Sequence, residues 1–449
     1  MLSVVTIVGR PNVGKSTLFN RLTNSKAALV LDVPGTTRDR NYGFGEIEGK
    51  FYILVDTAGI TGEKANDILI INQVDKAIYN AKIILFLVDA RIGLNPQDLD
   101  LAKKLRKFNK KVILVINKID GVNLDLGRID FFKLGFENCI EISAKSNRGI
   151  NNLKTNLMIF LNKEISNNDD INNINQENFN YVDHIKVTIV GQPNVGKSTL
   201  INNILGEDRV VVLDSPGTTR DSIYIPTQFG KQKYVLIDTA GVRRKSRIKD
   251  TLEKFSVIKT LQAIHDSEIT VLLIDAYKGI VDQDLKLIEC IVASGKSLVL
   301  ALNKWDLIYK EEQLKLLKRI HQQLGFINFT KPITISGLHG IGIKKIFQAI
   351  LKTFKSAIQE IPTNKLTLLL EQAIAEHQPP LSKGRRIKLR YAHLGGHFPF
   401  RIIIHGNQVN NLPLHYKKYL SNFYREKLKL EGTVVEIILK NSDNPYLAK

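Results

Sequence analysis

Eight consecutive residues near the start of the chain recur almost unchanged in its second half. Gly9-Arg10-Pro11-Asn12-Val13-Gly14-Lys15-Ser16 returns as Gly191-Gln192-Pro193-Asn194-Val195-Gly196-Lys197-Ser198. Both copies fit G-x-x-x-x-G-K-[ST], in which backbone N–H groups surround phosphate oxygens, the lysine reaches the terminal phosphates and the serine hydroxyl meets Mg²⁺. The pattern predicts two separate sites for a nucleoside triphosphate.

Companion motifs follow each copy in the same order. Pro-Gly-Thr-Thr-Arg-Asp at 34–39 returns at 216–221, and Asp-Thr-Ala-Gly at 56–59 returns at 238–241, each offset by 182 residues like the octapeptide itself. Asn-Lys-Ile-Asp at 117–120 returns as Asn-Lys-Trp-Asp at 303–306, and Ser-Ala at 143–144 returns as Ser-Gly at 336–337. A whole domain is therefore duplicated, with small insertions in the later loops of the second copy.

The residue types in these motifs predict a phosphate-dependent switch. Asp56 and Asp238 are placed to hold Mg²⁺ through water. Gly59 and Gly241 are placed to offer a backbone N–H to a γ-phosphate. Loss of this phosphate would therefore release the flanking segments. One threonine of each Thr-Thr pair would close over Mg²⁺. We favour the second of each pair, Thr37 and Thr219, although the sequence alone does not choose.

The Asn-Lys-x-Asp motifs predict which base is bound. A carboxylate can accept two hydrogen bonds from the N1 and N2 edge of guanine, whereas adenine would leave it facing no donor. A lone Asn-Lys-x-Asp is usually a surface turn, but here each copy ends an apolar run downstream of a phosphate loop. Guanine is the predicted base at both sites.

The position after Asp-Thr-Ala-Gly, where many small GTPases carry a water-orienting glutamine, is occupied by Ile60 and Val242. Neither side chain can polarise water, so another group must balance the charge of the transition state. Asn12 and Asn194 could hold K⁺ against the phosphates through their amide oxygens. The alternative is that these asparagines only shape the loop.

The predicted site residues fall into three overlapping sets. The predicted catalytic residues are Asn12, Lys15, Thr37, Asp56, Gly59, Asn194, Lys197, Thr219, Asp238 and Gly241. The predicted nucleotide contacts are Gly9, Arg10, Pro11, Asn12, Val13, Gly14, Lys15, Ser16, Asp56, Thr57, Ala58, Gly59, Ile60, Asn117, Lys118, Ile119, Asp120, Ser143, Ala144, Gly191, Gln192, Pro193, Asn194, Val195, Gly196, Lys197, Ser198, Asp238, Thr239, Ala240, Gly241, Val242, Asn303, Lys304, Trp305, Asp306, Ser336 and Gly337. The predicted Mg²⁺ ligands are Ser16, Thr37, Ser198 and Thr219, and the predicted K⁺ ligands are Asn12 and Asn194.

Apolar runs alternating with helical patterns predict the fold. Runs at 4–8, 51–55, 83–88, 112–116 and 139–142 are typical of parallel strands covered on both faces, and the second copy repeats them at 186–190, 234–237, 269–274, 297–302 and 332–335. This predicts an α/β protein with two tandem doubly wound P-loop domains, whose ligands bind at the carboxyl ends of the strands. Residues 366–375 and 414–430 are predicted helices and 386–391, 401–405 and 433–439 predicted strands, which indicates a small α+β module at the end.

Domain boundaries follow from the motif map and composition. We predict domains at 1–164 and 184–359, an Asn-rich flexible linker at 165–183 and a C-terminal module at 360–449. The two cysteines, Cys139 and Cys290, show no metal spacing and fit a reducing compartment. His393 and His397 flank Gly395-Gly396 without Cys or acidic neighbours in sequence, which favours a turn over a metal site.

Charge points toward polyanions without identifying one. The formal net charge is +20, which would attract nucleic acid, although a biased genome that enriches Lys on solvated faces is an alternative explanation. The final ninety residues, 360–449, hold fourteen Lys and Arg against seven Asp and Glu. Five basic residues between 243 and 249 follow the second Asp-Thr-Ala-Gly, where they would form either an RNA or domain contact gated by GTP or a solvated loop.

Two tandem G-x-P-N-V-G-K-S units followed by a short basic module resemble the EngA family of bacterial double GTPases, within the Era-like GTPases. The resemblance covers essentially the whole chain. It implies GTP hydrolysis in both units with GTP/GDP and Mg²⁺, a KH-like C-terminal domain, and a role in assembling the large ribosomal subunit, through ribosomal RNA and proteins. The C-terminal module lacks the G-x-x-G loop of ordinary KH domains.

Two other functions stay open at this point. A GTP-regulated scaffold for proteins or membranes is disfavoured by the lack of a lipidation motif or amphipathic anchor, and a GTPase subunit for tRNA modification would bring a catalytic domain that the sequence does not show. No apolar run reaches the roughly twenty residues of a membrane span. We expect a monomeric cytoplasmic protein without membrane association.

Overall fold

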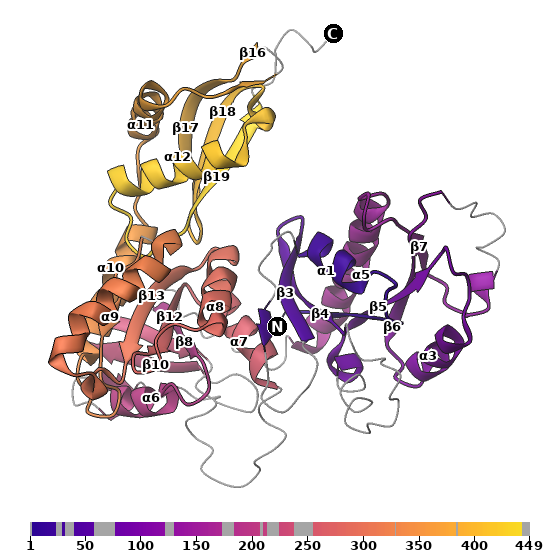
Figure 1. Ribbon diagram of the computed structural model, residues 1–449, viewed down its shortest axis with the longest axis horizontal. Helices are drawn as coiled ribbons and strands as arrows, with labels where there is room; N and C mark the ends of the chain where they lie inside the picture. The colour runs from indigo at the N-terminus through magenta and orange to yellow at the C-terminus, as the bar shows by residue number, and fades with distance from the viewer. Residues whose placement is uncertain are drawn as a thin grey trace. The chain divides into compact units, whose positions relative to one another are not determined.

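The computed structural model describes residues 2–23, 29–31, 40–57, 77–121, 130–172, 184–206, 210–212, 224–237, 255–327, 329–382 and 385–441. The chain divides into two compact units, residues 1–180 with 251–262 and residues 181–250 with 263–449. The first unit holds a seven-stranded sheet, and the second holds another seven-stranded sheet together with a three-stranded one (Figure 1).

The first sheet has the strand order β2-β3-β4-β1-β5-β6-β7, parallel from β4 to β7 and antiparallel at β2–β3 and β3–β4. Its strands are β1 (Val4–Gly9), β2 (Leu29–Leu31), β3 (Arg40–Ile47), β4 (Lys50–Asp56), β5 (Ile83–Asp89), β6 (Lys111–Asn117) and β7 (Cys139–Glu141). The accompanying helices include α1 (Lys15–Leu22), α3 (Pro96–Arg106) and α5 (Ile150–Asn172).

The second sheet repeats this topology. Starting from β9, the strand that corresponds to β2, its order is β9-β10-β11-β8-β12-β13-β14. Its strands are β8 (Ile185–Gly191), β9 (Val210–Val212), β10 (Tyr224–Phe229), β11 (Gln232–Ile237), β12 (Ile269–Asp275), β13 (Ser297–Asn303) and β14 (Ile333–Thr334). The helices are α6 (Lys197–Leu205), α7 (Phe255–Asp266), α8 (Asp282–Ala293), α9 (Lys310–Gln323) and α10 (Ile343–Ala357).

Strand β5 shows why continuous apolar runs form the centre of each sheet. All of its residues are buried. Ile83 and Leu85 belong to an apolar cluster with residues of α1 and α5, whereas Ile84 and Phe86 belong to another with residues of α3. Because successive side chains of a strand point to opposite faces, helices cover both faces of the sheet. The predicted doubly wound α/β fold is confirmed.

The C-terminal module is the predicted α+β unit. A three-stranded sheet has the order β17-β18-β19, antiparallel at β17–β18 and parallel at β18–β19. One face packs on two helices, with Leu366 and Leu420 among the residues buried against Ile402 and Ile404. The elements are α11 (Thr363–Glu376), β15 (Leu381–Ser382), β16 (Arg385–Arg386), β17 (Lys388–Gly396), β18 (Phe400–Asn407), α12 (Leu414–Lys427) and β19 (Val435–Asn441).

Within the second unit, the C-terminal module is joined to the larger sheet by backbone hydrogen bonds. Gly432 accepts from the Leu298 N–H at the start of β13 and donates to the Phe329 carbonyl, each over 2.7 Å. The Arg425 guanidinium of α12 lies 4.6 Å from the centre of the Phe329 ring, and burial lowers the pKa of Arg425. These contacts tie the module to the strand that ends at Asn303.

The structure differs from the predicted organisation in two places. Helix α5 continues to Asn172, so it extends into the predicted linker at 165–183, whose residues 173–183 lie outside the described ranges. His393, Gly395 and Gly396 belong to strand β17, and the turn follows at 397–399. Cross-strand pairing from Leu394 with Ile402 to Gly396 with Arg401 explains why two glycines there do not end the strand.

Replacing Gly432 with Ala should weaken the second unit. Gly432 has φ +67°, and an added Cβ would lie 2.5 Å from the Thr353 Oγ1 and 2.8 Å from the Leu298 carbonyl oxygen. Left-handed strain and overpacking each cost roughly 1–3 kcal/mol, so we expect a loss of about 2–4 kcal/mol in the free energy of unfolding, measured by urea denaturation. Gly230→Ala is the control, because φ there is +64° but the added Cβ meets nothing within 4 Å. Equal losses of unfolding free energy in both variants would show that Gly432 is not closely packed against Thr353 and Leu298.

Candidate nucleotide-binding sites

The first phosphate loop connects the end of β1 to the start of α1. Gly14 immediately precedes the helix with φ +100°, and a Cβ there would collide with the Asn117 amide nitrogen. The turn presents the first N–H groups of α1, which have no partner within the helix, together with the positive end of the helix dipole. This arrangement is suited to binding an anion.

The Lys15 ammonium lies inside the loop. It donates to the Gly9 carbonyl over 2.9 Å and to the Arg10 carbonyl over 2.5 Å. Burial lowers the pKa of Lys15 to about 8, against the opposing effect of Asp56. A phosphate bound beside this buried ammonium would supply a full negative charge, whereas the two carbonyl oxygens supply only partial negative charges.

Asp56 is fully buried at the end of β4, next to the phosphate loop. The Ser16 hydroxyl donates to the Asp56 carboxylate over 2.8 Å. A hydroxyl and a carboxylate held together are oxygen donors of the kind that Mg²⁺ prefers. The predicted Ser16 and Asp56 therefore meet, and their chemistry fits this ion.

Asn117, at the end of β6, links the two halves of the site. Its amide nitrogen donates to the Val13 carbonyl over 2.8 Å, and its amide oxygen accepts from the Ala144 N–H over 3.0 Å. One buried side chain thus fixes the phosphate loop relative to the Ser-Ala segment. This is a positioning role, distinct from direct contact with the base.

The carboxylate of Asp120 is oriented by two hydroxyls. Ser143 and Ser146 both donate to it, the latter over 2.9 Å, and these hydrogen bonds lower the pKa of Asp120. The Asp120 carboxylate is thereby kept ionised and able to accept hydrogen bonds, as recognition of guanine requires.

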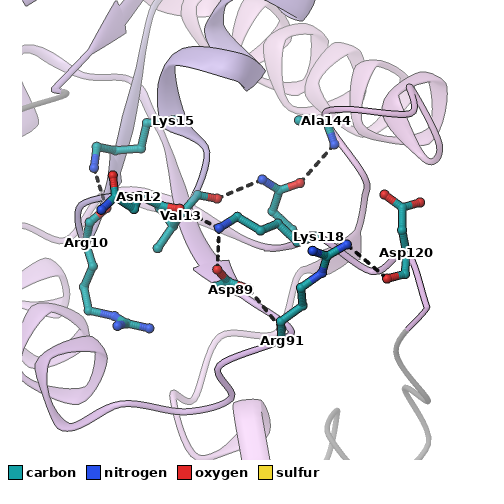
Figure 2. A network of polar contacts seen from close by, with 10 residues as sticks. Arg10, Asn12, Val13, Lys15, Asp89, Arg91, Lys118, Asp120 and Ala144 are labelled. Atoms are coloured by element: carbon teal, nitrogen blue, oxygen red, sulfur yellow. Dashed lines mark hydrogen bonds and ion pairs between the residues drawn. The ribbon is translucent and has the colours of Figure 1, made fainter.

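The lysine of the same motif is held by two contacts. Lys118 contacts the Asp89 carboxylate and the Asn12 carbonyl, each over 2.6 Å (Figure 2).

The second unit repeats these contacts. Lys197 donates to the carbonyls of Gly191 and Gln192 over 2.8 and 2.6 Å, and burial lowers the pKa of Lys197 to about 8. Asn303 donates to the Val195 carbonyl over 2.7 Å and accepts from the Gly337 N–H over 2.7 Å. Gly337 thus makes the same backbone contact as Ala144, although its motif departs from Ser-Ala-Lys.

One difference concerns the guanine-reading carboxylate of the second site. His339 occupies the place of Ser146, with its Nε2 3.9 Å from the Asp306 carboxylate. The distance is too long for a hydrogen bond. Asp306 is therefore held less closely than Asp120.

Several predicted site residues lie outside the described ranges. These are Thr37, Ala58, Gly59, Ile60, Thr219, Asp238, Thr239, Ala240, Gly241 and Val242. The basic cluster at 243–249 also lies outside them. Their predicted roles stay predictions.

Sequence reasoning missed four acidic residues that support the sites. Asp89 and Asp275, at the ends of β5 and β12, each contact the lysine of Asn-Lys-x-Asp over 2.6 Å. Asp98 contacts Arg10 over 2.7 Å, and Asp284 accepts from Gln192 over 3.0 Å. The sequence held a signal for these acids, because Asp89 and Asp98 recur as Asp275 and Asp284 at the 186-residue offset of Asn-Lys-x-Asp.

Two doubly wound sheets, each with a phosphate loop, a lysine held inside that loop and an oriented Asn-Lys-x-Asp, define a tandem P-loop GTPase. A family model described as 50S ribosome-binding GTPase matches residues 4–118 and 186–304, and one described as the KH-domain-like C-terminal domain of EngA bacterial GTPase enzymes matches residues 360–440.

Relatives extend the match over the full chain. GTPase Der of Hahella chejuensis is 47% identical over 451 residues, covering 100% of this chain and 93% of that protein. GTPase Der of Coxiella burnetii is 48% identical over 448 residues, covering 99% of each. The chain belongs to the GTPase Der family, so it binds GTP, GDP and Mg²⁺ and hydrolyses GTP, and its C-terminal domain is KH-like. Among solved structures, the G domain of the T. maritima FeoB iron transporter is 25% identical, with 36% of this chain and 99% of that chain covered and a TM-score of 0.30.

The described residues contain neither a membrane-spanning helix nor a metal-binding cluster. None of their helices has the length and apolarity to cross a bilayer. No group of three or more His, Cys, Asp or Glu side chains with metal-binding geometry occurs among them. His397 instead contacts the Ala357 carbonyl over 2.8 Å and Glu360 over 3.2 Å.

Calorimetry should detect two GDP equivalents per chain, and Asn117→Ala should weaken only one of them. The variant leaves the Val13 carbonyl and the Ala144 N–H unpaired, which costs about 1–3 kcal/mol, or roughly 5- to 150-fold in affinity. Asn303→Ala should have the mirrored effect, and Asn156→Ala, on an exposed face of α5, should have none. A single binding event in the wild-type protein, or a preference for ATP, would contradict two guanine sites.

Proposed function

We propose that this protein is a GTP-driven switch that binds the ribosome in the cytoplasm and assists maturation of the large subunit, as a monomer. The observation that carries the proposal is the fusion, in one chain, of two guanine-nucleotide sites with a basic KH-like domain. The family description, 50S ribosome-binding GTPase, and the net charge of +20 support an RNA-rich partner.

The contacts of these side chains support the following proposed roles at the first site. Lys15 contacts the terminal phosphates, Ser16 and Asp56 hold Mg²⁺ directly and through water, and Asp120 accepts from guanine. The second site repeats these roles with Lys197, Ser198, Asp238 and Asp306. Thr37 and Thr219 close over Mg²⁺, and Gly59 and Gly241 sense the γ-phosphate.

The domain division we propose places G domains at 1–164 and 184–359, joined through 165–183, with the KH-like domain at 360–449. The second G domain and the KH-like domain share one compact unit, and Gly432 and Arg425 join them. A GTP-dependent change in the second G domain therefore reaches the RNA-facing domain through direct contacts.

Sedimentation with ribosomal subunits tests the main proposal. With a non-hydrolysable GTP analogue, the protein should pellet with the large subunit, and with GDP this fraction should fall severalfold. A Lys15→Ala, Lys197→Ala double variant should lose the nucleotide dependence, because both phosphate contacts are gone. The pelleted fraction should fall steeply with salt, as for contacts to phosphates. Absence of the protein from every ribosomal fraction would instead favour a scaffold for other proteins.

We further propose that Asn12 and Asn194 each hold K⁺ at the phosphates. Both residues have φ +62°, a conformation that asparagine tolerates better than most residues. Their side-chain amides make no hydrogen bond among the described residues, whereas the Asn12 backbone carbonyl accepts from Lys118. Loop shape therefore rests on the backbone, which leaves the amides available for a cation.

An Asn12→Gly, Asn194→Gly double variant separates these two roles, because glycine keeps the positive φ and removes the amide. In the wild-type protein, replacing K⁺ with Na⁺ at fixed ionic strength should lower GTP turnover at least about tenfold, since loss of one preorganised charge contact costs on the order of 10²–10³ in rate. The double variant should bind GDP but turn over slowly in either salt. Equal wild-type turnover in K⁺ and Na⁺ would remove the K⁺ role.

A further inference from the structure

The KH-like sheet has a second face, which its two helices do not cover. On β18, Ile402 and Ile404 point into the helix-covered core, whereas the alternate residue His405 does not. His405 pairs directly with Tyr391 on β17, and Ile403 pairs with His393. Because neighbouring residues paired across strands share a face, Tyr391, His393 and His405 lie together on this second face.

These three aromatic side chains form one stack. The Tyr391 and His405 rings are nearly parallel, with an interplanar angle of 4° and centroids 4.5 Å apart. His393 lies 5.2 Å from His405, and their Nε2 atoms are 3.2 Å apart. Burial, followed by the neighbouring His393 and Lys440, lowers the pKa of His405. The stack is therefore built around a neutral imidazole at neutral pH.

Tyr391 is the outer member of the stack. Its neighbour His405 lies on the central strand, while β17 is at an edge of the three-stranded sheet. Tyr391 is 41% exposed although its ring stacks on His405. Part of this side chain is therefore accessible to a ligand from solvent.

Cations surround the stack. Lys440 pairs directly with His405 across β18–β19 and is exposed, and Lys388 and Arg390 on β17 are exposed as well. The acid on this face, Glu436, is neutralised by Arg401 over 2.9 Å. The face thus combines an exposed aromatic ring with exposed positive charge.

We propose that this face, defined by Tyr391, His393, His405, Lys388 and Lys440, is a stacking platform for unpaired bases of ribosomal RNA. The inference rests on the proposed ribosome binding and assigns the surface that makes the contact. A base can stack on Tyr391 because every base has a π face, while the lysines contact the flanking phosphates. Such a site needs no G-x-x-G clamp, which this domain lacks.

A protein partner is less well matched by the same face. Protein interfaces are typically depleted of lysine, whereas this face carries Lys388 on β17 and Lys440 on β19, the strands on either side of His405. Single-stranded nucleic acid offers phosphates that match the positive charge and bases that can stack on the flat Tyr391 ring.

Binding of a fluorescein-labelled unstructured RNA 12-mer to the full-length protein tests the platform. Tyr391→Ala should weaken binding about 5- to 150-fold, the range measured for loss of one stacked base, and Tyr391→Phe should retain it. Lys440→Ala should lower the slope of log affinity against log salt by about one, whereas Tyr391→Ala should leave this slope unchanged. Tyr79→Ala removes another exposed tyrosine, 70% exposed, in the first unit and outside the platform, and is the control.

Two results would overturn the platform while leaving ribosome binding standing. In one, Tyr391→Ala pellets with ribosomes and binds the 12-mer like the wild type. In the other, the variant changes the hydrodynamic radius of the free protein without changing RNA affinity, which would identify the face as a protein contact. Unchanged melting temperature and GTP turnover in Tyr391→Ala show that the variant is folded. Failure of the wild type to pellet with ribosomes, with 12-mer binding intact, would count against the proposed function alone.

Discussion

A single buried amide at the end of the fourth parallel strand holds each nucleotide site together. A phosphate loop must expose its N–H groups to a ligand, so it cannot use them to fix its own shape. In the first unit the Asn117 side chain contacts the Val13 carbonyl and the Ala144 N–H instead. The loops that face the phosphates and those that face the base thereby share one rigid support, and Asn303 does the same in the second unit. The absence of a side chain at Gly14 and Gly196 follows from this, because a Cβ at either glycine would strike the amide.

The two copies keep this support and diverge around it. In the first unit Arg10 forms an ion pair with the buried Asp98, whereas in the second the neutral Gln192 contacts Asp284, and burial raises the pKa of Asp284. A buried carboxylate without a cationic partner is more costly to ionise than one beside a guanidinium. The pockets therefore have the same framework but different electrostatics near the phosphates, so equal behaviour of the two sites does not follow from their equal motifs.

The sequence predicted the centre of each domain better than its edges. Strands such as β5 are buried on both faces and leave a continuous apolar run, which is easy to recognise. Strand β3 (Arg40–Ile47) alternates glycines, aromatics and polar residues and pairs antiparallel near the sheet edge, so it has no such run. The supporting acids Asp89 and Asp98 were missed because their partners are distant in sequence and only the fold brings them together. His393 and His405 are likewise twelve residues apart, and only the register of β17 with β18 makes them neighbours.

Strand β13 connects the chemistry of the second site to the KH-like domain. Near its start Leu298 donates a hydrogen bond to Gly432, and its last residue is Asn303, which holds the phosphate loop. A fully buried strand within a parallel sheet has little freedom to deform, because each shift would break paired backbone groups on both sides. The contacts with the second G domain come from Gly432 and from α12 of the KH-like domain. The aromatic stack lies on the face of the sheet that α12 does not cover. The domain can therefore stay attached to the GTPase through one side while the aromatic face on its other side is available for the proposed RNA contact, and both lie in the same compact unit as the second nucleotide site.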